Sequence, residues 1–167
     1  MAVQASLTGH LVFATLHTND SAGAITRLMN MGIEPFLVTS STIAIQAQRL
    51  VRRICSNCKE GYEPDPESLR DLGVNLDDPR LKRLHHGTGC EKCASRGYFG
   101  RSGIFELLVM SGRIQEMVLQ GADSNAIKRE ARREGMRTLR EDGAEKMLRG
   151  ETTAEEILRV TRDEVLE

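Results

Sequence analysis

The sequence is poor in aromatic residues, with no tryptophan, two tyrosines and four phenylalanines. Lysine and arginine number 23 against 24 aspartates and glutamates, so the formal net charge is -1. A protein that binds nucleic acid needs a basic surface for the phosphates or aromatic side chains for the bases. Because the chain has neither in excess, we expect no nucleic-acid partner.

Long apolar runs are also missing. No stretch approaches the roughly 18 apolar residues that a transmembrane helix requires, so we expect no direct membrane insertion. The N-terminus shows no basic residues followed by an apolar stretch, and therefore no visible signal peptide. We expect a cytoplasmic protein.

Sequence motifs of several common catalytic sites are absent as well. There is no phosphate-binding G-x-x-x-x-G-K-[ST] loop, no G-x-S-x-G nucleophile elbow and no H-E-x-x-H pair. What remains is an ordinary globular composition, 40% hydrophobic and 28% charged, in 167 residues. Taken alone, the chain is expected to be catalytically incomplete.

The cysteines form two identical pairs, Cys55-Ser-Asn-Cys58 and Cys90-Glu-Lys-Cys93. Two C-x2-C knuckles predict one tetrahedral zinc ion held by four thiolates. Such a filled shell leaves no position for water, so the zinc is expected to be structural.

Other interpretations of the cysteines stay open. The cysteines could form two disulfides, although a reducing cytosol disfavours them. They could also be four unrelated free thiols, or one pair could be a thioredoxin-like redox motif. His85 and His86 lie near the second pair and are interpreted as surface residues, with replacement of one cysteine ligand as the lesser alternative.

The first third of the chain has the pattern of an α/β domain. His10–Leu16 is a short apolar run typical of a buried parallel strand. Thr18–Ser21 offers helix N-cap residues, and helical spacing of apolar residues follows as far as Gly32. A second helix is predicted from about Pro35 to Ala47, and a strand over Gln48–Ile54.

The rest of the chain divides into a polar segment and a helical region. Residues 55–93 contain three of the four prolines of the chain, and a short helix is predicted within them at Pro66–Gly73. The segment is too polar to bury much apolar surface, so a metal is expected to supply its stability. A glycine-rich turn is predicted at 97–103 and a strand over Ile104–Met110. Helical apolar spacing predicts four helices after that, with the charge cluster Lys128–Arg133 on a solvated face.

Two histidines flank the predicted first strand. His10 and His17 are an odd number of residues apart, so on a regular strand they point to opposite faces and cannot share a metal. A structural, hydrogen-bonded histidine is the simplest interpretation of each. His17 is the better functional candidate, because ligands bind at the carboxyl ends of strands in open α/β sheets.

Several motifs resemble one family along the whole chain. Thr8-Gly-His-Leu-Val-Phe-Ala-Thr-Leu-His-Thr-Asn-Asp20 resembles the His box of the ATPases of type II secretion and type IV pilus assembly. The resemblance continues in Gly97-Tyr-Phe-Gly-Arg-Ser-Gly-Ile-Phe-Glu106 and in Gly135-Met-Arg-Thr-Leu-Arg-Glu-Asp-Gly143. It includes both cysteine pairs, which export and assembly motors carry and retraction motors typically lack.

The resemblance implies an α/β fold: the C-terminal part of a RecA-like P-loop motor domain with an inserted tetracysteine zinc subdomain and a C-terminal helical region. Residues 1–54 would be the end of the ATPase core, 55–96 the zinc-binding subdomain, and 97–167 a returning strand and the helical region. In that family the Walker A loop, the Asp box and the Walker B carboxylate precede the His box. The parent would be a hexameric ATPase using ATP and Mg²⁺, and this chain alone would be inactive.

The resemblance also implies roles for single residues. His17 would sense the γ-phosphate and His10 would support the His box, which makes them the catalytic candidates. Arg27, Arg49 and Arg101 match family positions near nucleotide or subunit surfaces. The zinc subdomain would contact the platform protein of the inner membrane. An autonomous zinc-binding interaction module is the alternative, and a phosphate loop encoded upstream of this chain would decide against it.

Overall fold

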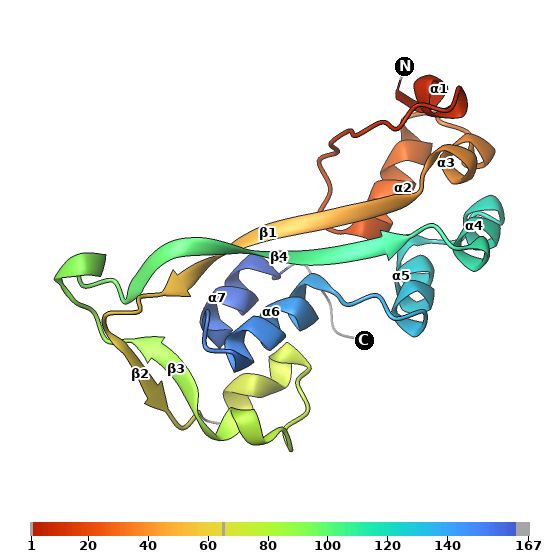
Figure 1. Cartoon of the computed structure of the whole chain (residues 1–167). Helices are drawn as coiled ribbons and strands as arrows, with labels where there is room; N and C mark the ends of the chain where they lie inside the picture. The colour runs from red at the N-terminus through yellow and green to blue at the C-terminus, as the bar shows by residue number, and fades with distance from the viewer. Residues whose placement is uncertain (1, 65, 163–167) are drawn as a thin grey trace. The chain divides into compact units, whose positions relative to one another are not determined.

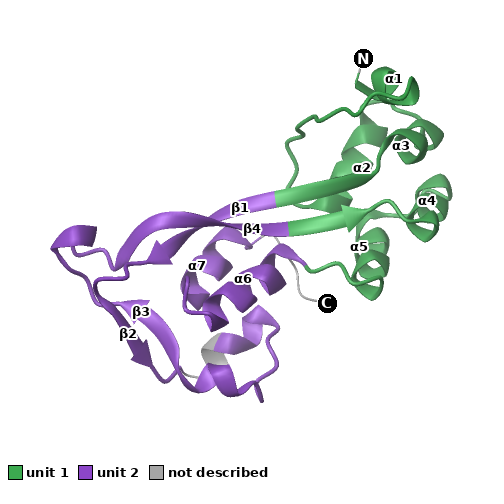
Figure 2. Cartoon of the chain, viewed as in Figure 1, with its two compact units in different colours: residues 1–47, 106–137 green, residues 48–105, 138–167 purple. Residues whose placement is uncertain are grey.

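A computed structural model describes residues 2–64 and 66–162 of the chain (Figure 1). The chain forms two compact units, and each is built from two separate stretches of sequence (Figure 2). Unit 1 comprises residues 1–47 and 106–137, and unit 2 comprises residues 48–105 and 138–167. The three-part organisation expected from the sequence stays a prediction.

Two long strands contribute to both units. β1 (Ala44–Ile54) and β4 (Tyr98–Val109) pair in a two-stranded sheet, and each unit contains one stretch of both strands. Along β4 every second residue is buried near its end, with Ile104, Glu106 and Leu108 inside and Phe105 and Leu107 exposed. This alternation is what a strand with one covered face requires.

Unit 1 packs helices around its stretch of the two strands. The helices are α1 (Ala2–Leu7), α2 (Ser21–Asn30), α3 (Pro35–Ser41), α4 (Gly112–Leu119) and α5 (Ser124–Arg133). Asp20, Ser111 and Asp123 cap the N-termini of α2, α4 and α5 with their side-chain oxygens. The core consists of apolar residues at helical and strand spacing: Ala22, Ile25, Val38, Leu108, Met110, Ile114, Val118, Ile127, Ala131 and Met136.

The strand predicted at His10–Leu16 does not form. Residues 10–18, all of which the structure describes, have neither helix nor strand. Leu11 and Phe13 are 73% and 90% exposed, so the apolar run covers no core. A strand needs a hydrogen-bonded neighbour, and none of the described residues pairs with this segment.

The helix predicted from Pro35 to Ala47 was too long. It ends at Ser41, and the chain enters β1 at Ala44. The hydroxyls of Thr39, Ser40 and Ser41 donate to backbone carbonyls within the same helix. Such back-bonding serines and threonines, followed by β-branched residues, favour an early helix end.

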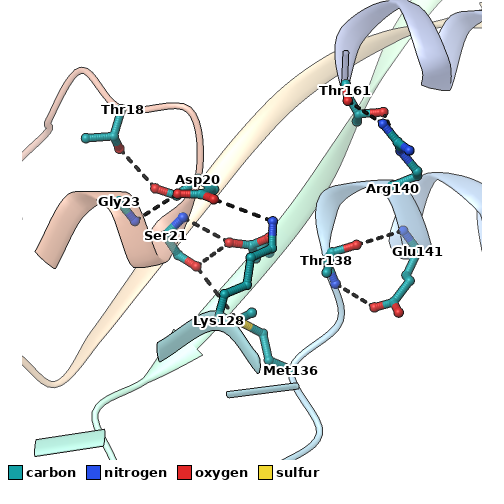
Figure 3. Close-up of polar contacts among 11 residues, drawn as sticks. Thr18, Asp20, Ser21, Gly23, Lys128, Met136, Thr138, Arg140, Glu141 and Thr161 are labelled. Carbon is teal, nitrogen blue, oxygen red and sulfur yellow. Dashed lines mark hydrogen bonds and ion pairs between the residues drawn. The ribbon is translucent and has the colours of Figure 1, made fainter. Parts of the chain in front are cut away.

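Unit 2 contains a small antiparallel sheet, 3₁₀ helices and two α-helices. β2 (Lys59–Tyr62) pairs with β3 (Leu84–Gly87). The 3₁₀ helices are η1 (Pro66–Leu72), η2 (Pro79–Lys82) and η3 (Glu91–Cys93), and the α-helices are α6 (Leu139–Leu148) and α7 (Ala154–Val160). α6 begins with a capping box in which Thr138 and Glu141 exchange side-chain and backbone hydrogen bonds (Figure 3).

The segment between the cysteine pairs has a core, contrary to the sequence prediction. Leu69, Leu72, Leu81 and Leu84 are at most 6% exposed and pack with Met147 of α6 and Ile157 of α7. The sequence around these leucines is polar, but four of them suffice because distant helices cover them. Stability in this segment therefore does not depend on a metal alone.

The C-terminal half otherwise follows the prediction, with one difference. Helices α4 to α7 lie where apolar spacing predicted them. The glycine-rich stretch 97–103 is not a turn, because β4 already begins at Tyr98. Gly100 takes a φ of 79° within this strand, which only glycine adopts readily.

Among the described residues, no helix has both the length and the apolar character needed to cross a bilayer.

Candidate metal centre

Four cysteine side chains meet in unit 2. The Sγ atoms of Cys55, Cys58, Cys90 and Cys93 all lie within 4.8 Å of one another. The distances are 3.8 Å for Cys55–Cys90, 3.9 Å for Cys58–Cys93 and 3.7 Å for Cys90–Cys93. Sulfurs bound to one zinc ion at about 2.3 Å in a tetrahedron stand about 3.8 Å apart. The four thiols therefore have the spacing of a closed tetrahedral metal site.

The local chain conformation presents each pair as a knuckle. The backbone N–H of Cys58 donates to the carbonyl of Cys55, and the N–H of Cys93 donates to that of Cys90. After the second pair, Ala94 has a left-handed φ of 50°, which turns the chain away from the sulfurs. Both cysteines of each pair thus point to the same centre.

Backbone N–H groups surround the sulfurs. Gly89 donates to Cys58 Sγ at 3.3 Å, while Cys90 and Gly97 donate to Cys93 Sγ at 3.2 Å and 3.3 Å. Such hydrogen bonds stabilise thiolates and orient them toward a metal. The residues present therefore fit a metal: four thiol donors lie within 4.8 Å of one another, and backbone N–H groups support two of the sulfurs.

The thiols differ in acidity. Burial raises the pKa of the Cys58 thiol to about 12, whereas a hydrogen bond from the Asn57 side chain lowers the pKa of Cys90 to about 6. Metal ligands must be thiolates, so binding a divalent ion releases protons from the cluster. A bound divalent ion would therefore compete with protons for the four sulfurs, and its affinity would fall as the pH falls.

Two glycines allow the knuckles to meet. A Cβ atom on Gly87 would collide with the backbone of Gly97, and a Cβ on Gly97 would collide with that of Gly87. Gly97 also has a φ of 73°. The backbone N–H of Cys55 donates to the carbonyl of Gly97 at 2.9 Å, which joins the two knuckles. Only glycine fits this contact.

Unit 2 also contains a buried carboxylate that binds the end of β1. Glu156 on α7 is fully buried, and its carboxylate binds Arg52 of β1 at 2.5 Å and Arg159 at 2.8 Å. The Arg52 guanidinium also lies 4.2 Å from the ring centre of Tyr98. Arg52 and Tyr98 lie near the ends of the strands that lead into the knuckles. This ion-pair network therefore holds those strand ends to α7.

Both predicted histidines lie in the irregular segment 10–18 of unit 1. His10 Nδ1 is 3.0 Å from the Thr8 hydroxyl, and both His10 and His17 are exposed. They are not on a strand, so the prediction that they face opposite sides of one does not apply. Their catalytic roles stay predictions.

The three predicted arginines are divided between the units. Arg27 lies exposed on α2 in unit 1. Arg49 on β1 and Arg101 on β4 belong to unit 2, Arg49 half-buried and Arg101 exposed. Their roles at a nucleotide or subunit surface stay predictions.

Sequence reasoning missed the buried charges. Glu106 and Glu156 are each at most 1% exposed, and Lys128 belongs to an ion pair rather than to a solvated face. The available signal for Glu106 was its position: it alternates with Ile104 and Leu108 on the covered face of a strand. No comparable signal marks Lys128, which needs a partner from elsewhere in the chain.

The geometry defines a mixed α/β chain with a cluster of four cysteines that could hold a metal ion. A family model described as "Type II/IV secretion system protein" matches residues 1–159, and the chain belongs to that family. The resemblance seen in the His box, the cysteine pairs and the C-terminal motifs is thereby confirmed.

Curated relatives cover nearly all of this chain. It is 52% identical over 158 residues to the type IV pilus assembly ATPase PilB of Thermus thermophilus, across 95% of this chain and 18% of that protein. It is 49% identical over 164 residues to the type II secretion system protein E of Pseudomonas aeruginosa, across 98% of this chain and 32% of that protein. The type II secretion system ATPase E of Vibrio cholerae is 47% identical over 163 residues. The chain thus spans between about a fifth and a third of the length of these relatives.

Proposed function

We propose that this chain is the C-terminal part of a RecA-like ATPase that powers type IV pilus assembly or type II protein secretion. The observation that carries the proposal is the level of identity, 52% and 49% across almost the whole chain, to proteins named for these two processes. Identity to both kinds is nearly equal, so the proposal includes both.

The exposure of the apolar segment at residues 10–18 supports the proposal that this segment belongs to a larger sheet. Leu11 and Phe13 are apolar and 73% and 90% exposed, which is costly for a surface segment in water. In the proposed ATPase this segment is a buried strand that pairs with strands from outside this chain. His17 then stands at the strand's carboxyl end, where ligands bind in α/β sheets.

The chain's own chemical contribution is small in this proposal. His17 donates a hydrogen bond to the γ-phosphate, His10 supports the segment, and Arg27, Arg49 and Arg101 face nucleotide or neighbouring subunits. Phosphoryl transfer depends on such positioned donors and cations. The sequence has no phosphate-binding loop, so ATP and Mg²⁺ are held by regions outside this chain and no binding step is assigned to it alone.

We propose zinc as the metal of the tetracysteine centre. Four thiolates select zinc or iron–sulfur chemistry, and one ion in a tetrahedron matches the 3.7–3.9 Å spacing between sulfurs. When bound, zinc would link the two knuckles to each other.

The neighbouring surface carries Lys92, whose ammonium lies 5.4 Å from the centre of the Phe99 ring. This exposed, basic and aromatic surface is proposed to contact the platform protein of the inner membrane, with the ATPase a cytoplasmic homohexamer.

The proposal is tested on the gene and on its longer product. We expect a G-x-x-x-x-G-K-[ST] loop encoded within roughly 100 residues upstream of Met1. The longer product should hydrolyse ATP, and His17→Ala should lower kcat about 100-fold, as removal of a phosphate-stabilising donor does. Gln4→Ala, an exposed change in α1, is the control.

An upstream sequence without such a loop, together with no ATP turnover, would contradict the proposal. Metal-dependent capture of a partner by this chain in that case would favour the autonomous zinc-binding module. Elemental analysis of the purified chain tests the metal separately, with one zinc per chain expected.

A further inference from the structure

A buried polar network lies in unit 1 at the start of α2, separate from the metal centre (Figure 3). Glu106 on β4 is 1% exposed, and its Oε1 accepts hydrogen bonds from the backbone N–H of Ser21 at 2.9 Å and from the Ser21 hydroxyl. Lys128 Nζ of α5 lies 3.4 Å from Asp20 Oδ2 and 3.9 Å from Glu106 Oε2. One ammonium group thus faces two carboxylates.

Asp20 joins this network to the segment that carries His17. The Asp20 carboxylate accepts from the backbone N–H of Gly23 at 2.8 Å and caps α2. The backbone carbonyl of Asp20 accepts from the Thr18 hydroxyl at 3.1 Å (Figure 3). The residues directly after His17 are therefore tied to α2, and through Glu106 and Lys128 to β4 and α5.

The charges of the network depend on one another. Two carboxylates and one ammonium leave a negative charge, which lies against the first N–H groups of α2, where the helix dipole favours anions. Glu106 Oε2 is buried and has no hydrogen bond within the described residues, so Lys128 provides its nearest compensation. Removing the Lys128 charge leaves the buried Glu106 carboxylate uncompensated, which is strongly unfavourable. Removing the Glu106 charge weakens the hydrogen bonds that its carboxylate accepts from Ser21 and takes away one of the two anions that hold Lys128.

Such a network does not maximise stability, because apolar side chains of similar volume often stabilise a core as well or better. In some proteins a buried charged network instead specifies one defined geometry. We propose that Glu106 and Lys128 are positioning residues for His17: they fix the Thr18–Ser21 turn, and through it the place of the imidazole. This inference rests on the proposed function, in which His17 contacts the γ-phosphate.

Amide exchange on this 167-residue chain tests whether the network fixes the Thr18–Ser21 turn. Glu106→Gln keeps the shape of the side chain and removes its charge, and Lys128→Met does the same for the ammonium. We expect amides of residues 18–24 to exchange about tenfold faster or more in both variants, with the rest of unit 1 unchanged. Glu116→Gln, which changes an exposed glutamate on α4, is the matched control and should change nothing.

Unchanged exchange at residues 18–24 in the folded variants would overturn the inference, and so would a uniform increase across unit 1. If the charge variants do not fold, Ser21→Ala removes a single hydroxyl donor to Glu106 and keeps both charges. It should speed exchange at residues 18–24 by a smaller factor. Lys128→Arg, which retains the charge, should restore most of the protection lost in Lys128→Met.

The longer ATPase of the proposed function supplies a second measurement. Glu106→Gln should lower kcat about tenfold with little change in the KM for ATP, and it should add almost no loss to His17→Ala. Losses that add fully in the double variant would overturn the positioning role. A longer protein without any ATP turnover would refute the proposed function. The amide-exchange result would still show whether Glu106 and Lys128 fix the Thr18–Ser21 turn.

Discussion

The Glu156 carboxyl makes the stability of the fold depend on pH. Burial alone would raise the pKa of its carboxyl, but hydrogen bonds from Arg159 and Arg52 outweigh the burial and lower the pKa to about 2. A carboxyl whose pKa is lower in the folded state stabilises the fold above its unfolded pKa of about 4.3. That stability is lost as the pH falls from there toward 2.

We predict that Glu156→Gln removes about 3 kcal/mol from the free energy of unfolding of unit 2 at pH 7. The difference between the wild-type chain and the variant should shrink steadily from pH 5 to pH 2. Denaturant unfolding at each pH measures it, and the comparison cancels metal loss, which affects both proteins. Glu155→Gln, an exposed neighbour, is the control. A difference that stays constant with pH would contradict the assignment.

Position 97 is a second site with a strict requirement, because only glycine fits there. Alanine there must collide with the Gly87 backbone and adopt an unfavourable φ of 73°. We predict that Gly97→Ala lowers zinc affinity at least tenfold, measured by competition with a chromophoric chelator. Gly112→Ala is the control, because its Cβ meets nothing within 4 Å. Equal zinc affinity in the two variants would contradict the close contact of the knuckles.

At the scale of elements, the cysteine knuckles and the leucine-rich stretch between them should respond differently to metal removal. The knuckles and the adjoining β2 and β3 depend on the four thiolates meeting. The 3₁₀ helices η1 and η2 instead pack their leucines on Met147 and Ile157. A metal contributes most where few apolar contacts exist.

We predict that chelation speeds amide exchange over residues 55–62 and 84–98, whereas residues 69–81 and the helices α6 and α7 stay largely protected. Cys58→Ser should reproduce the pattern, because three thiolates cannot complete the tetrahedron. Ser56→Ala, an exposed change within the first knuckle, is the control. Loss of protection at 69–81 as large as that in the knuckles would show that the leucine core depends on the metal.

At the scale of the whole molecule, the purified chain is predicted to show no ATP turnover. The sequence has no phosphate-binding loop, and phosphoryl transfer needs groups that hold the phosphates and the metal ion. A coupled assay with excess ATP and Mg²⁺ measures it. Steady turnover that His17→Ala abolishes would contradict the prediction.

The elements that could be predicted are those with local signals. Asp20 belongs to the predicted cap cluster Thr18–Ser21 and caps α2, because a capping side chain bonds to its own first turn. Helices α4 to α7 follow from apolar residues at helical spacing. The metal centre was predictable for the same reason: two short knuckles place their thiols locally, and only their meeting requires the fold.

The failures of prediction have long-range causes. The apolar run at 10–16 has the composition of a strand, but a strand requires a partner, and no described residue supplies one. The segment from Leu69 to Leu84 is polar in sequence, yet its leucines are buried because α6 and α7, far along the chain, cover them.

The sequence by itself determined the helices with their caps, the two cysteine knuckles and the family to which the chain belongs. These depend on residues close together in the chain, whose spacing is visible without a fold. Only the tertiary structure decided that Glu106 and Glu156 are buried and that Lys128 and Arg52 neutralise them. Each of these charges is stable inside the protein only because a distant segment brings its partner within reach.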